Sequence, residues 1–273
     1  MTAPTVPPAR PAPRLVATDL DGTIVSHAGD VTDRTVSALR AVAALGVPVV
    51  FVTGRPARWM ADVADRVGHS GLAVCANGAV LYDLASEEVV FHDPIAIDVG
   101  LEVADRLRKA IPGIAFAVET MDGFAHEPTY LARWDAGFER VVAPLEEIYT
   151  APALKLLARH EAMGPDSLLA AARKAVGDRV ELTHSSTTAL LEMSAAGVSK
   201  ATGLARFAAE HDVGAADVVA FGDMPNDLPM LAWAGRAYAV TTGHPEVLAA
   251  VTGRVGPPEE HGVAIELEHL FAL

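Results

Sequence analysis

Two aspartates stand two positions apart, directly after a short apolar run near the start of the chain. The run covers residues 15–18, and Asp19 and Asp21 follow it, with Gly22 next. If the strand continues, side chains at i and i+2 point to the same side, and the glycine lets the backbone turn away. Paired carboxylates at a strand end can bind Mg²⁺, attack as a nucleophile or transfer a proton. A plain Asp-Gly turn remains the alternative for this motif alone.

A threonine and a glycine follow the next apolar run. Residues 47–52 lead into Thr53, Gly54 and Arg55, and Pro56 then opens a helix, where its missing N–H costs nothing. A hydroxyl and a free backbone N–H at a helix start suit a phosphoryl oxygen. Taken alone, the motif is more typical of a threonine that only caps the helix, with the arginine in solvent.

A lysine and an acidic motif complete the set of candidate residues. Lys200 opens a predicted helix, where its charge opposes the helix dipole, so a nearby phosphate or carboxylates would have to compensate for it. The apolar run 218–221 is followed by Gly222 and by three polar residues, Asp223, Asn226 and Asp227. An exposed lysine without a role, and acids that only favour a helix start, are the alternatives for these two motifs.

The elements around these motifs predict an α/β fold with a doubly wound, mainly parallel sheet, because short apolar runs alternate with helix-period segments. Each polar motif follows such a run or begins a helix, and open parallel sheets bind ligands at the carboxyl ends of their strands. The predicted strands are residues 15–18, 47–52, 72–75, 80–82, 218–221 and 237–240, and the predicted helices include 33–44, with Thr32 as N-cap and Gly46 as stop, and 245–251.

The middle of the chain has a different rhythm, with a helix face around residues 101–111 and several short strand-like runs. We expect residues 84–188 to form a separate α+β cap inserted into a catalytic core made of residues 15–83 and 189–273. Residues 1–14 hold five prolines and are predicted to be a disordered tail.

Composition excludes several classes of function. The net charge of −14 and the 5% aromatic content argue against nucleic-acid binding, which needs basic surfaces and stacking platforms. Cys75 is the only cysteine, so the chain has no internal disulfide, cysteine-rich zinc site or Fe–S cluster. The longest apolar stretch is too short for a bilayer, and the proline-rich start is unlike a secretory leader. We therefore expect a cytoplasmic protein that binds neither nucleic acid nor membranes.

In this order, the motifs resemble those of the haloacid dehalogenase superfamily of phosphohydrolases. Its four motifs are DxD(G/T)T, a Ser/Thr after the second strand, a Lys, and GDxxND, and here they read as residues 19–23, Thr53, Lys200 and residues 223–227. The middle segment resembles the large C2 cap of that superfamily. Three further matches are typical of its Cof-type branch: residues 75–79, 191–193 and 242–247.

The resemblance implies a role for each motif residue. Asp19 would be the nucleophile that forms an aspartyl-phosphate, and Asp21 the general acid and base. Mg²⁺ would be held by Asp19, the backbone carbonyl of Asp21, and Asp223. The phosphoryl oxygens would be held by the Leu20 N–H, Thr53, the Gly54 N–H, Lys200 and Asn226. Met224 would offer a further contact near the metal, and Asp227 would hold the metal ligands in place without binding the metal itself.

Charge also calls for a metal at such a site. Four aspartates would bring about four negative charges to a site for an anion, against one positive charge from Lys200, and a divalent cation offsets that repulsion. The implied function is a Mg²⁺-dependent phosphatase acting on small phosphorylated metabolites, such as sugar phosphates or similar phosphomonoesters. His126, Glu127, Trp134, Lys155 and His184 could face the substrate, although packing or surface roles are more common for such residues.

Other functions remain as alternatives. A phosphomutase or a dedicated sugar-phosphate phosphatase would use the same core, and a catalytically silent binding module is disfavoured because all the motif residues are present. The chain lacks the GxGxxG of dinucleotide-binding proteins, the GxxxxGK[ST] of P-loop NTPases, the GxSxG of α/β-hydrolases and the HExxH of zinc hydrolases. The sequence does not distinguish a monomer from a homodimer.

Overall fold

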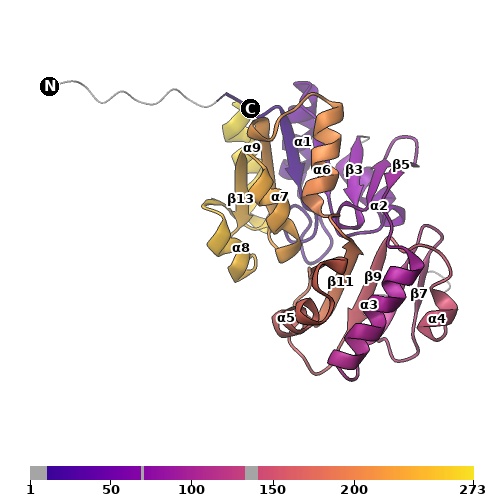
Figure 1. Cartoon of the computed structure of the whole chain (residues 1–273). Coiled ribbons are helices and arrows are strands. Elements are labelled where there is room, and N and C mark those ends of the chain that lie inside the picture. The colour runs from indigo at the N-terminus through magenta and orange to yellow at the C-terminus, as the bar shows by residue number, and fades with distance from the viewer. Residues whose placement is uncertain (1–10, 69–70, 133–140) are drawn as a thin grey trace.

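The computed structural model describes residues 11–68, 71–132 and 141–273, which form two β-sheets, one above the other in Figure 1. The larger sheet has eight strands in the order β14-β13-β12-β1-β2-β3-β4-β5. Its strands are β1 (Leu15–Thr18), β2 (Val49–Val52), β3 (Leu72–Cys75), β4 (Val80–Asp83), β5 (Glu88–His92), β12 (Val218–Gly222), β13 (Arg236–Val240) and β14 (Gly253–Val255). The pairings from β14 through to β3 are parallel, whereas β4 and β5 are antiparallel additions.

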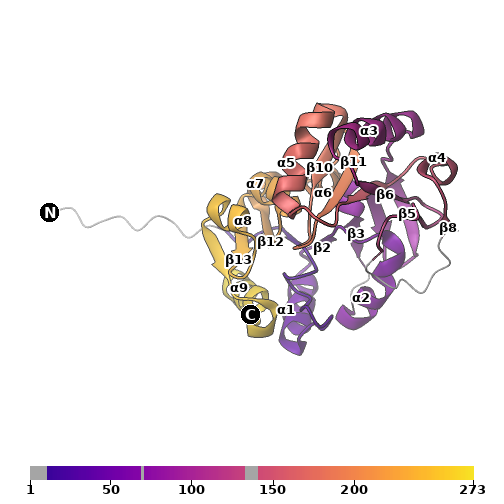
Figure 2. The ribbon, with the colours of Figure 1, turned by 90° about the horizontal axis from the view of Figure 1, so that it is seen from below.

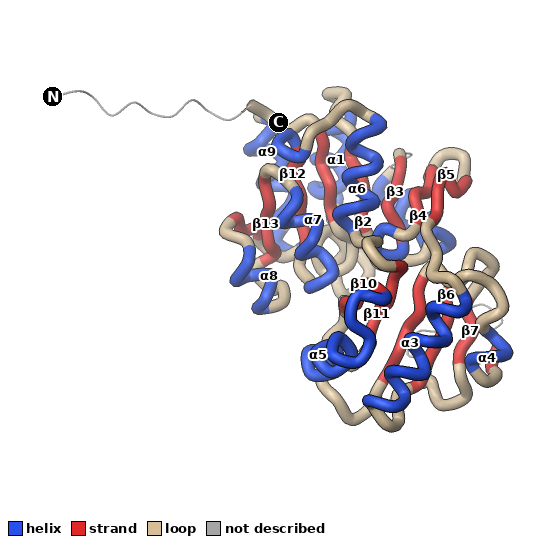
Figure 3. The backbone as a smooth tube through the Cα atoms, viewed as in Figure 1, coloured by secondary structure: helices blue, strands red, loops and turns tan. Residues whose placement is uncertain are grey.

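Helices cover both faces of the eight-stranded sheet, as predicted for a doubly wound α/β fold. On one face, Val16 and Phe51 pack with α1 (Asp33–Ala44), α2 (Met60–Val67) and α9 (Gly262–Phe271). On the other, Ala17 and Val50 pack with α6 (Lys200–Glu210), α7 (Leu228–Trp233) and α8 (Pro245–Ala250). Figure 3 shows α6 and α7 in front of the strands. Neighbouring strand residues thus face opposite layers, and both layers are apolar.

The second sheet has six strands in the order β10-β11-β9-β6-β7-β8. They are β6 (Ala115–Glu119), β7 (Phe124–His126), β8 (Val141–Val142), β9 (Lys155–Arg159), β10 (Val180–Thr183) and β11 (Leu190–Ala195). Helices α3 (Ile97–Ala110), α4 (Leu145–Ile148) and α5 (Pro165–Val176) pack on one face of it, and Figure 2 shows α3 and α5 side by side there. This unit is therefore α+β, as expected for the middle of the chain.

Sheet membership places both ends of the inserted segment several residues later in the chain than the sequence predicted. Residues 84–188 were expected to form the insert, but β5, at residues 88–92, pairs with β4 and extends the larger sheet. At the other end, β11 at residues 190–195 pairs with β9 and β10 in the second sheet. The chain therefore leaves the larger sheet after His92 and returns to it after Ala195. Both strands lie next to a boundary, where apolar patterning alone does not reveal the pairing partner.

The local signals of the first helix are confirmed. The Thr32 side chain accepts a hydrogen bond from the Thr35 N–H, as an N-cap should, and α1 ends at Ala44, two residues before Gly46 at φ +78°. The strands β5, β7, β8 and β14 were not predicted as separate elements, and each has at most five residues.

The connection between β3 and β4 is a four-residue turn, residues 76–79, that joins the paired strand ends Cys75 and Val80. Ala76, Asn77 and Gly78 all have positive φ, at 50°, 57° and 105°, in a 3₁₀ turn between β3 and the antiparallel β4. Three consecutive left-handed residues are costly, and such strain is found where a site over-determines the backbone.

Two expectations fall partly outside the described residues. The predicted tail is described only from residue 11 onward, and Trp134 lies in the undescribed segment 133–140. Within the described ranges, no helix is long and apolar enough to cross a membrane.

Candidate active site

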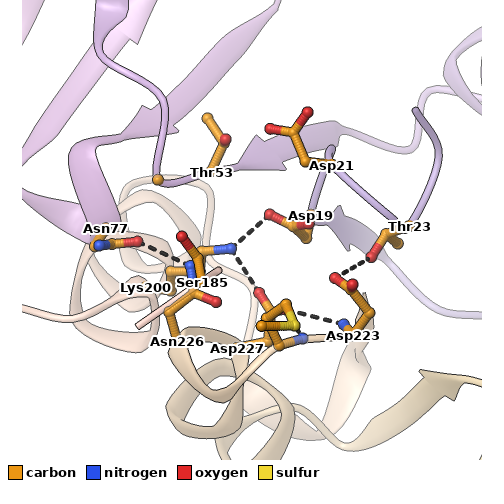
Figure 4. A network of polar contacts seen from close by, with 12 residues as sticks. Asp19, Asp21, Thr23, Thr53, Asn77, Ser185, Lys200, Asp223, Asn226 and Asp227 are labelled. Atoms are coloured by element: carbon orange, nitrogen blue, oxygen red, sulfur yellow. Dashed lines mark hydrogen bonds and ion pairs between the residues drawn. The ribbon is translucent and has the colours of Figure 1, made fainter. Parts of the chain in front are cut away.

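Three of the four predicted motifs meet at the carboxyl ends of β1 and β12, around the buried lysine at the start of α6 (Figure 4). Lys200 Nζ donates to Asp19 Oδ1 at 2.6 Å and to Asp227 Oδ1 at 2.5 Å. The lysine side chain is fully buried, and the Asp19 side chain is 8% exposed. Parallel strands bring their ends to one edge of the sheet, so residues far apart in the sequence become neighbours there.

Asp223 forms the second wall of the site. Its Oδ1 accepts a hydrogen bond from the Thr23 hydroxyl at 3.2 Å. Gly22 has φ +82°, and a Cβ at this position would collide with the carboxylate of Asp223. The glycine of the first motif is therefore required twice, for its left-handed backbone and for the close approach of the Asp223 side chain.

Asp227 shapes the loop that carries Asp223. Its Oδ2 accepts from the backbone N–H groups of Asp223 and Met224, each at 2.9 Å, while its other oxygen is paired with Lys200. Asp227 is completely buried. These contacts fit the supporting role expected for Asp227, since both of its oxygens already have partners within the chain.

Asp21 lies apart from the aspartate cluster. Its side chain is 58% exposed and forms a two-point ion pair with Arg55, in which the Arg55 Nε donates to Oδ2 at 2.8 Å. Asp21 and Asp19 were expected on the same side of a continuing strand, but the chain turns at once, with the Leu20 carbonyl accepting from the N–H groups of Thr23, Ile24 and Val25. Figure 4 shows the Asp21 carboxylate directed away from Asp223.

Gly54, directly after Thr53, lies close to the side chains of Asn77 and Asn226. Thr53 is buried and its Oγ1 accepts from the Arg55 N–H at 3.1 Å, which is a local turn and not a helix cap, because the 3₁₀ helix that follows begins at Ala57 with Pro56 as its N-cap. Asn226 Nδ2 donates to Asn77 Oδ1 at 3.1 Å, and Asn226 Oδ1 is buried without a hydrogen-bond partner in the described structure. A buried amide oxygen without a partner is costly unless a ligand or water supplies a donor.

Apart from Lys155, the sequence did not identify the residues that connect this site to the six-stranded sheet. Asn77 Nδ2 donates to Glu192 Oε2 at 2.6 Å, and Glu192 Oε1 accepts from Lys155 Nζ at 3.3 Å and from the Ser185 hydroxyl at 3.1 Å. Lys155 Nζ also donates to the Gly54 carbonyl at 2.7 Å. Asn77 and Glu192 lay within the matches to the Cof-type branch, and that signal could have marked them as site residues.

Of the other residues expected to face the substrate, Lys155 lies on this network, while two pair within the six-stranded unit. Glu127 is bound by Arg108 and accepts from the Phe116 N–H, and His126 Nδ1 contacts the Glu127 carbonyl. These contacts favour a packing role for His126 and Glu127. His184 is buried beside Asp166.

The charges of the cluster shift its acid–base properties strongly. Burial, with Asp19 and Asp227 nearby, raises the pKa of Asp223 to about 9. Burial also raises the pKa of Asp19 to about 7, although Lys200 opposes the rise. Burial alone would lower the pKa of Lys200, but the carboxylates of Asp19 and Asp227 raise it, so the lysine stays charged. One cation is therefore too little for three buried acids.

The donor set fits a hard divalent cation. Carboxylate oxygens of Asp19, Asp223 and Asp227 lie within 4.8 Å of one another. All the candidate ligand atoms are oxygens, which Mg²⁺ prefers over nitrogen or sulfur. Asp223, whose pKa is raised furthest, is the acid that gains most from a neighbouring positive charge. The cluster thus meets the chemical requirements of a divalent metal site.

Several known proteins are similar to this chain in sequence and in fold. A family model described as haloacid dehalogenase-like hydrolase matches residues 16–267. The putative phosphatase YxeH of Bacillus subtilis is 25% identical, over 94% of this chain and 98% of its own length. The HMP-PP phosphatase of Yersinia pestis is also 25% identical, over 94% of both chains.

A solved structure adds the fold. The phosphatase BT1666 of Bacteroides thetaiotaomicron is 22% identical, with a TM-score of 0.80 over all of both chains. The family model spans nearly the whole chain, including both sheets and every motif residue of the site. The chain therefore belongs to the haloacid dehalogenase-like hydrolase family, as a phosphohydrolase of its Cof-type branch.

Proposed function

We propose that this protein is a Mg²⁺-dependent phosphatase that hydrolyses small phosphorylated metabolites through an aspartyl-phosphate on Asp19. The observation that carries the proposal is the position of the Asp19 carboxylate, which is buried, held by Lys200 and close to Asp223. A carboxylate fixed between a cation and a metal-binding group is placed to attack a phosphoryl group that the same charges bind.

In the first step, a carboxylate oxygen of Asp19 forms a bond to phosphorus, and the bond from phosphorus to the substrate oxygen breaks. Asp21 donates a proton to that leaving oxygen. In the second step, Asp21 takes a proton from water, the water oxygen attacks phosphorus, and phosphate leaves with the Asp19 carboxylate restored. Proton transfer of this kind contributes roughly 10²–10⁴ in rate.

Arg55 has to release Asp21 for this cycle. The ion pair holds the Asp21 carboxylate away from the aspartate cluster, whereas proton donation needs Asp21 to reach the leaving oxygen of the substrate. Arg55 therefore keeps Asp21 away from the substrate until the pair separates. A bound anionic substrate offers the arginine another partner and so favours that separation.

The remaining residues position the phosphoryl group. Lys200, the Thr53 hydroxyl, the Leu20 and Gly54 N–H groups and the Asn226 amide are proposed to hold its oxygens, as donors placed where charge develops. Asp19, the Asp21 backbone carbonyl and Asp223, with Met224 nearby, would hold Mg²⁺, which would supply charge neutralisation. Asp227 keeps the Asp223 loop and Lys200 in place.

The six-stranded unit, which lies between His92 and Ala195, is proposed to be the substrate-selecting cap, and the segments before and after it are proposed to form the catalytic core. Its face opposite α3 and α5 bears Lys155 and Glu192, which reach Gly54 and Asn77 of the site. The name HMP-PP phosphatase of one relative indicates that small phosphorylated compounds are substrates within the family.

Replacement of Asp19 by asparagine tests the proposal. Asp19→Asn keeps the shape of the side chain but removes the nucleophilic charge, so turnover of p-nitrophenyl phosphate with Mg²⁺ should fall by several orders of magnitude. Asp30→Asn, on an exposed turn, is the matched control and should keep wild-type turnover. More than a few per cent of wild-type turnover in a folded Asp19→Asn variant would refute the assignment. Transfer of phosphate to a second sugar phosphate, without net release, would indicate a mutase instead.

A further inference from the structure

A second group of side chains in the described residues has the chemistry of a metal site, and the proposed phosphatase reaction does not use it. It consists of Asp166, His184 and His244, whose candidate ligand atoms all lie within 4.8 Å of one another. Two imidazoles and one carboxylate differ from the all-oxygen aspartate cluster. Mixed nitrogen and oxygen donors are the set that Zn²⁺ binds in proteins, usually with water as a fourth ligand.

The three residues come from three segments on both sides of the boundary between the sheets. Asp166 is in the first turn of α5, and His184 follows β10, so both belong to the six-stranded unit. His244 directly precedes α8, in the loop after β13 of the larger sheet. Helices α5 and α8 are neighbours in Figure 1. A cation bound by all three would connect the two units.

The distances suit tetrahedral coordination. The Nε2 atoms of His184 and His244 lie 3.0 Å and 3.4 Å from the same Asp166 oxygen, Oδ1. Around a tetrahedral zinc with bonds of about 2.0–2.1 Å, neighbouring ligand atoms are about 3.3 Å apart. The two rings are nearly perpendicular, at 79° with centroids 5.4 Å apart, so their Nε2 atoms approach from different directions. The site needs only a small adjustment to accept the ion.

His184 gives the strongest indication of a ligand. It is completely buried, its Nε2 is directed at Asp166, and its Nδ1 has no hydrogen-bond partner in the described structure. A buried imidazole is normally satisfied at both nitrogens. In the absence of a metal, Nε2 carries the ring proton and donates it to the Asp166 carboxylate, which can only accept. A cation that replaces this proton would bind Nε2 and the Asp166 oxygen together, with the ring proton moved to Nδ1.

His244 and Asp166 complete the site at little cost. His244 Nδ1 accepts one long hydrogen bond, 3.3 Å, from the Glu246 N–H. Metal binding at Nε2 moves the ring proton to Nδ1 and breaks that bond, while forming a metal–nitrogen bond in exchange. The Asp166 side chain is 69% exposed, so its carboxylate is accessible and leaves room for a water as fourth ligand.

We propose that Asp166, His184 and His244 form a zinc site that fastens the six-stranded unit to the loop behind the active site. The backbone N–H of His244 donates to the backbone carbonyl of Asp223 at 2.7 Å. The ion would therefore hold α5 next to the segment that positions Asp223. Mg²⁺ prefers the aspartate cluster and Zn²⁺ the histidines, so the two ions sort between the two sites by donor chemistry.

Calorimetric titration of the full chain with ZnCl₂, in excess Mg²⁺ and without substrate, tests the site. Wild type should bind one Zn²⁺. The Asp166→Asn and His244→Ala variants should bind it more weakly, and their dissociation constants should rise by more than the roughly 10–100-fold that is typical when a hydrogen-bond partner of a metal ligand is removed. His160→Ala is the matched control, because His160 also accepts a backbone N–H at Nδ1 but contacts no carboxylate among the described residues. It should bind as wild type does.

Thermal unfolding provides a second readout that does not depend on catalysis. Zn²⁺ should raise the Tm of wild type and His160→Ala, and should raise it less in the Asp166 and His244 variants. Asp166 is exposed, so Asp166→Asn remains testable if a histidine variant fails to fold. Equal Zn²⁺ affinity in wild type and a folded Asp166→Asn variant would overturn the site. Because Asp19, Asp223 and Asp227 are unchanged in every variant, zinc bound there is common to all of them, and loss of phosphatase activity is a separate result.

Discussion

At the scale of single residues, the account depends on how much charge one lysine can balance. Lys200 pairs with Asp19 and Asp227, and Asp223 has only a threonine hydroxyl among its side-chain hydrogen bonds in the described structure. The raised pKa values of Asp19 and Asp223 follow from burial of acids with too little positive charge nearby. A metal that binds here must therefore displace protons, and its binding must depend on pH.

The stabilisation by Mg²⁺ is expected to increase with pH. Acids whose pKa rises on folding stabilise the native state at low pH, and this contribution is lost between their unfolded value of 3.8 and about 9, the value for Asp223. Without metal, Asp19 and Asp223 should thus destabilise the fold progressively as pH rises through this range, and Mg²⁺ should restore stability. We expect a larger rise of Tm with Mg²⁺ at pH 8 than at pH 5.5. A rise of Tm that is equal at both pH values would contradict this linkage. So would a rise that persists undiminished at pH 8 in the Asp223→Asn variant.

At the scale of elements, strand ends and helix starts explain why most of the site could be predicted. Asp19, Thr53 and Asp223 each follow a buried strand, and parallel strands bring their ends together. Asp21 shows the limit of this reasoning. A tight turn is found where a straight strand was expected, and the Asp21 carboxylate is ion-paired with Arg55. The Asn77–Glu192 and Asn77–Asn226 contacts could not be predicted from spacing, since they join residues 115 and 149 positions apart.

The turn between β3 and β4 also positions Lys200, so it should be sensitive to a single methyl group. At Gly78, with φ +105°, an added Cβ would collide with the Ser199 carbonyl, directly before Lys200. Gly78→Ala should cost at least the roughly 1–3 kcal/mol of a strained left-handed residue and should lower turnover as well. The matched control is Gly46→Ala, at φ +78° with nothing within 4 Å, which should cost only the backbone strain and keep its turnover. Denaturant unfolding and phosphate release measure both effects, and equal losses of stability in the two variants would count against the close approach.

At the scale of the whole molecule, buried polar contacts hold the two sheets together over the site. Glu192 is buried, and burial alone would raise its pKa, but Lys155, Asn77 and Ser185 lower it. The doubly wound fold was predictable because its strands are apolar and separated by helices, whereas the docking of the second sheet depends on such side-chain pairs. A buried ion pair leaves no periodic signal in a sequence, which is why this interface was not foreseen.

Removal of Lys155 should therefore be far more damaging than removal of an exposed lysine. Lys155→Met leaves Glu192 buried without its cation, which typically costs about 3–5 kcal/mol. Lys109→Met, in an exposed pair with Asp105, is the matched control and should cost at most about 1 kcal/mol. Urea unfolding of both variants gives the comparison. Similar free energies of unfolding for the two variants would show that the buried pair does not join the sheets.

The central claim is that the phosphoryl group is transferred to Asp19, and capture of that covalent state tests it most directly. Enzyme mixed with substrate and Mg²⁺ should be quenched in acid within one turnover, digested and analysed by mass spectrometry. We predict one added phosphoryl group on the peptide that contains Asp19, and none after omission of Mg²⁺ or in Asp19→Asn. Rapid substrate hydrolysis with a phosphoryl group on a different residue, or full turnover by the Asp19→Asn variant, would contradict the account.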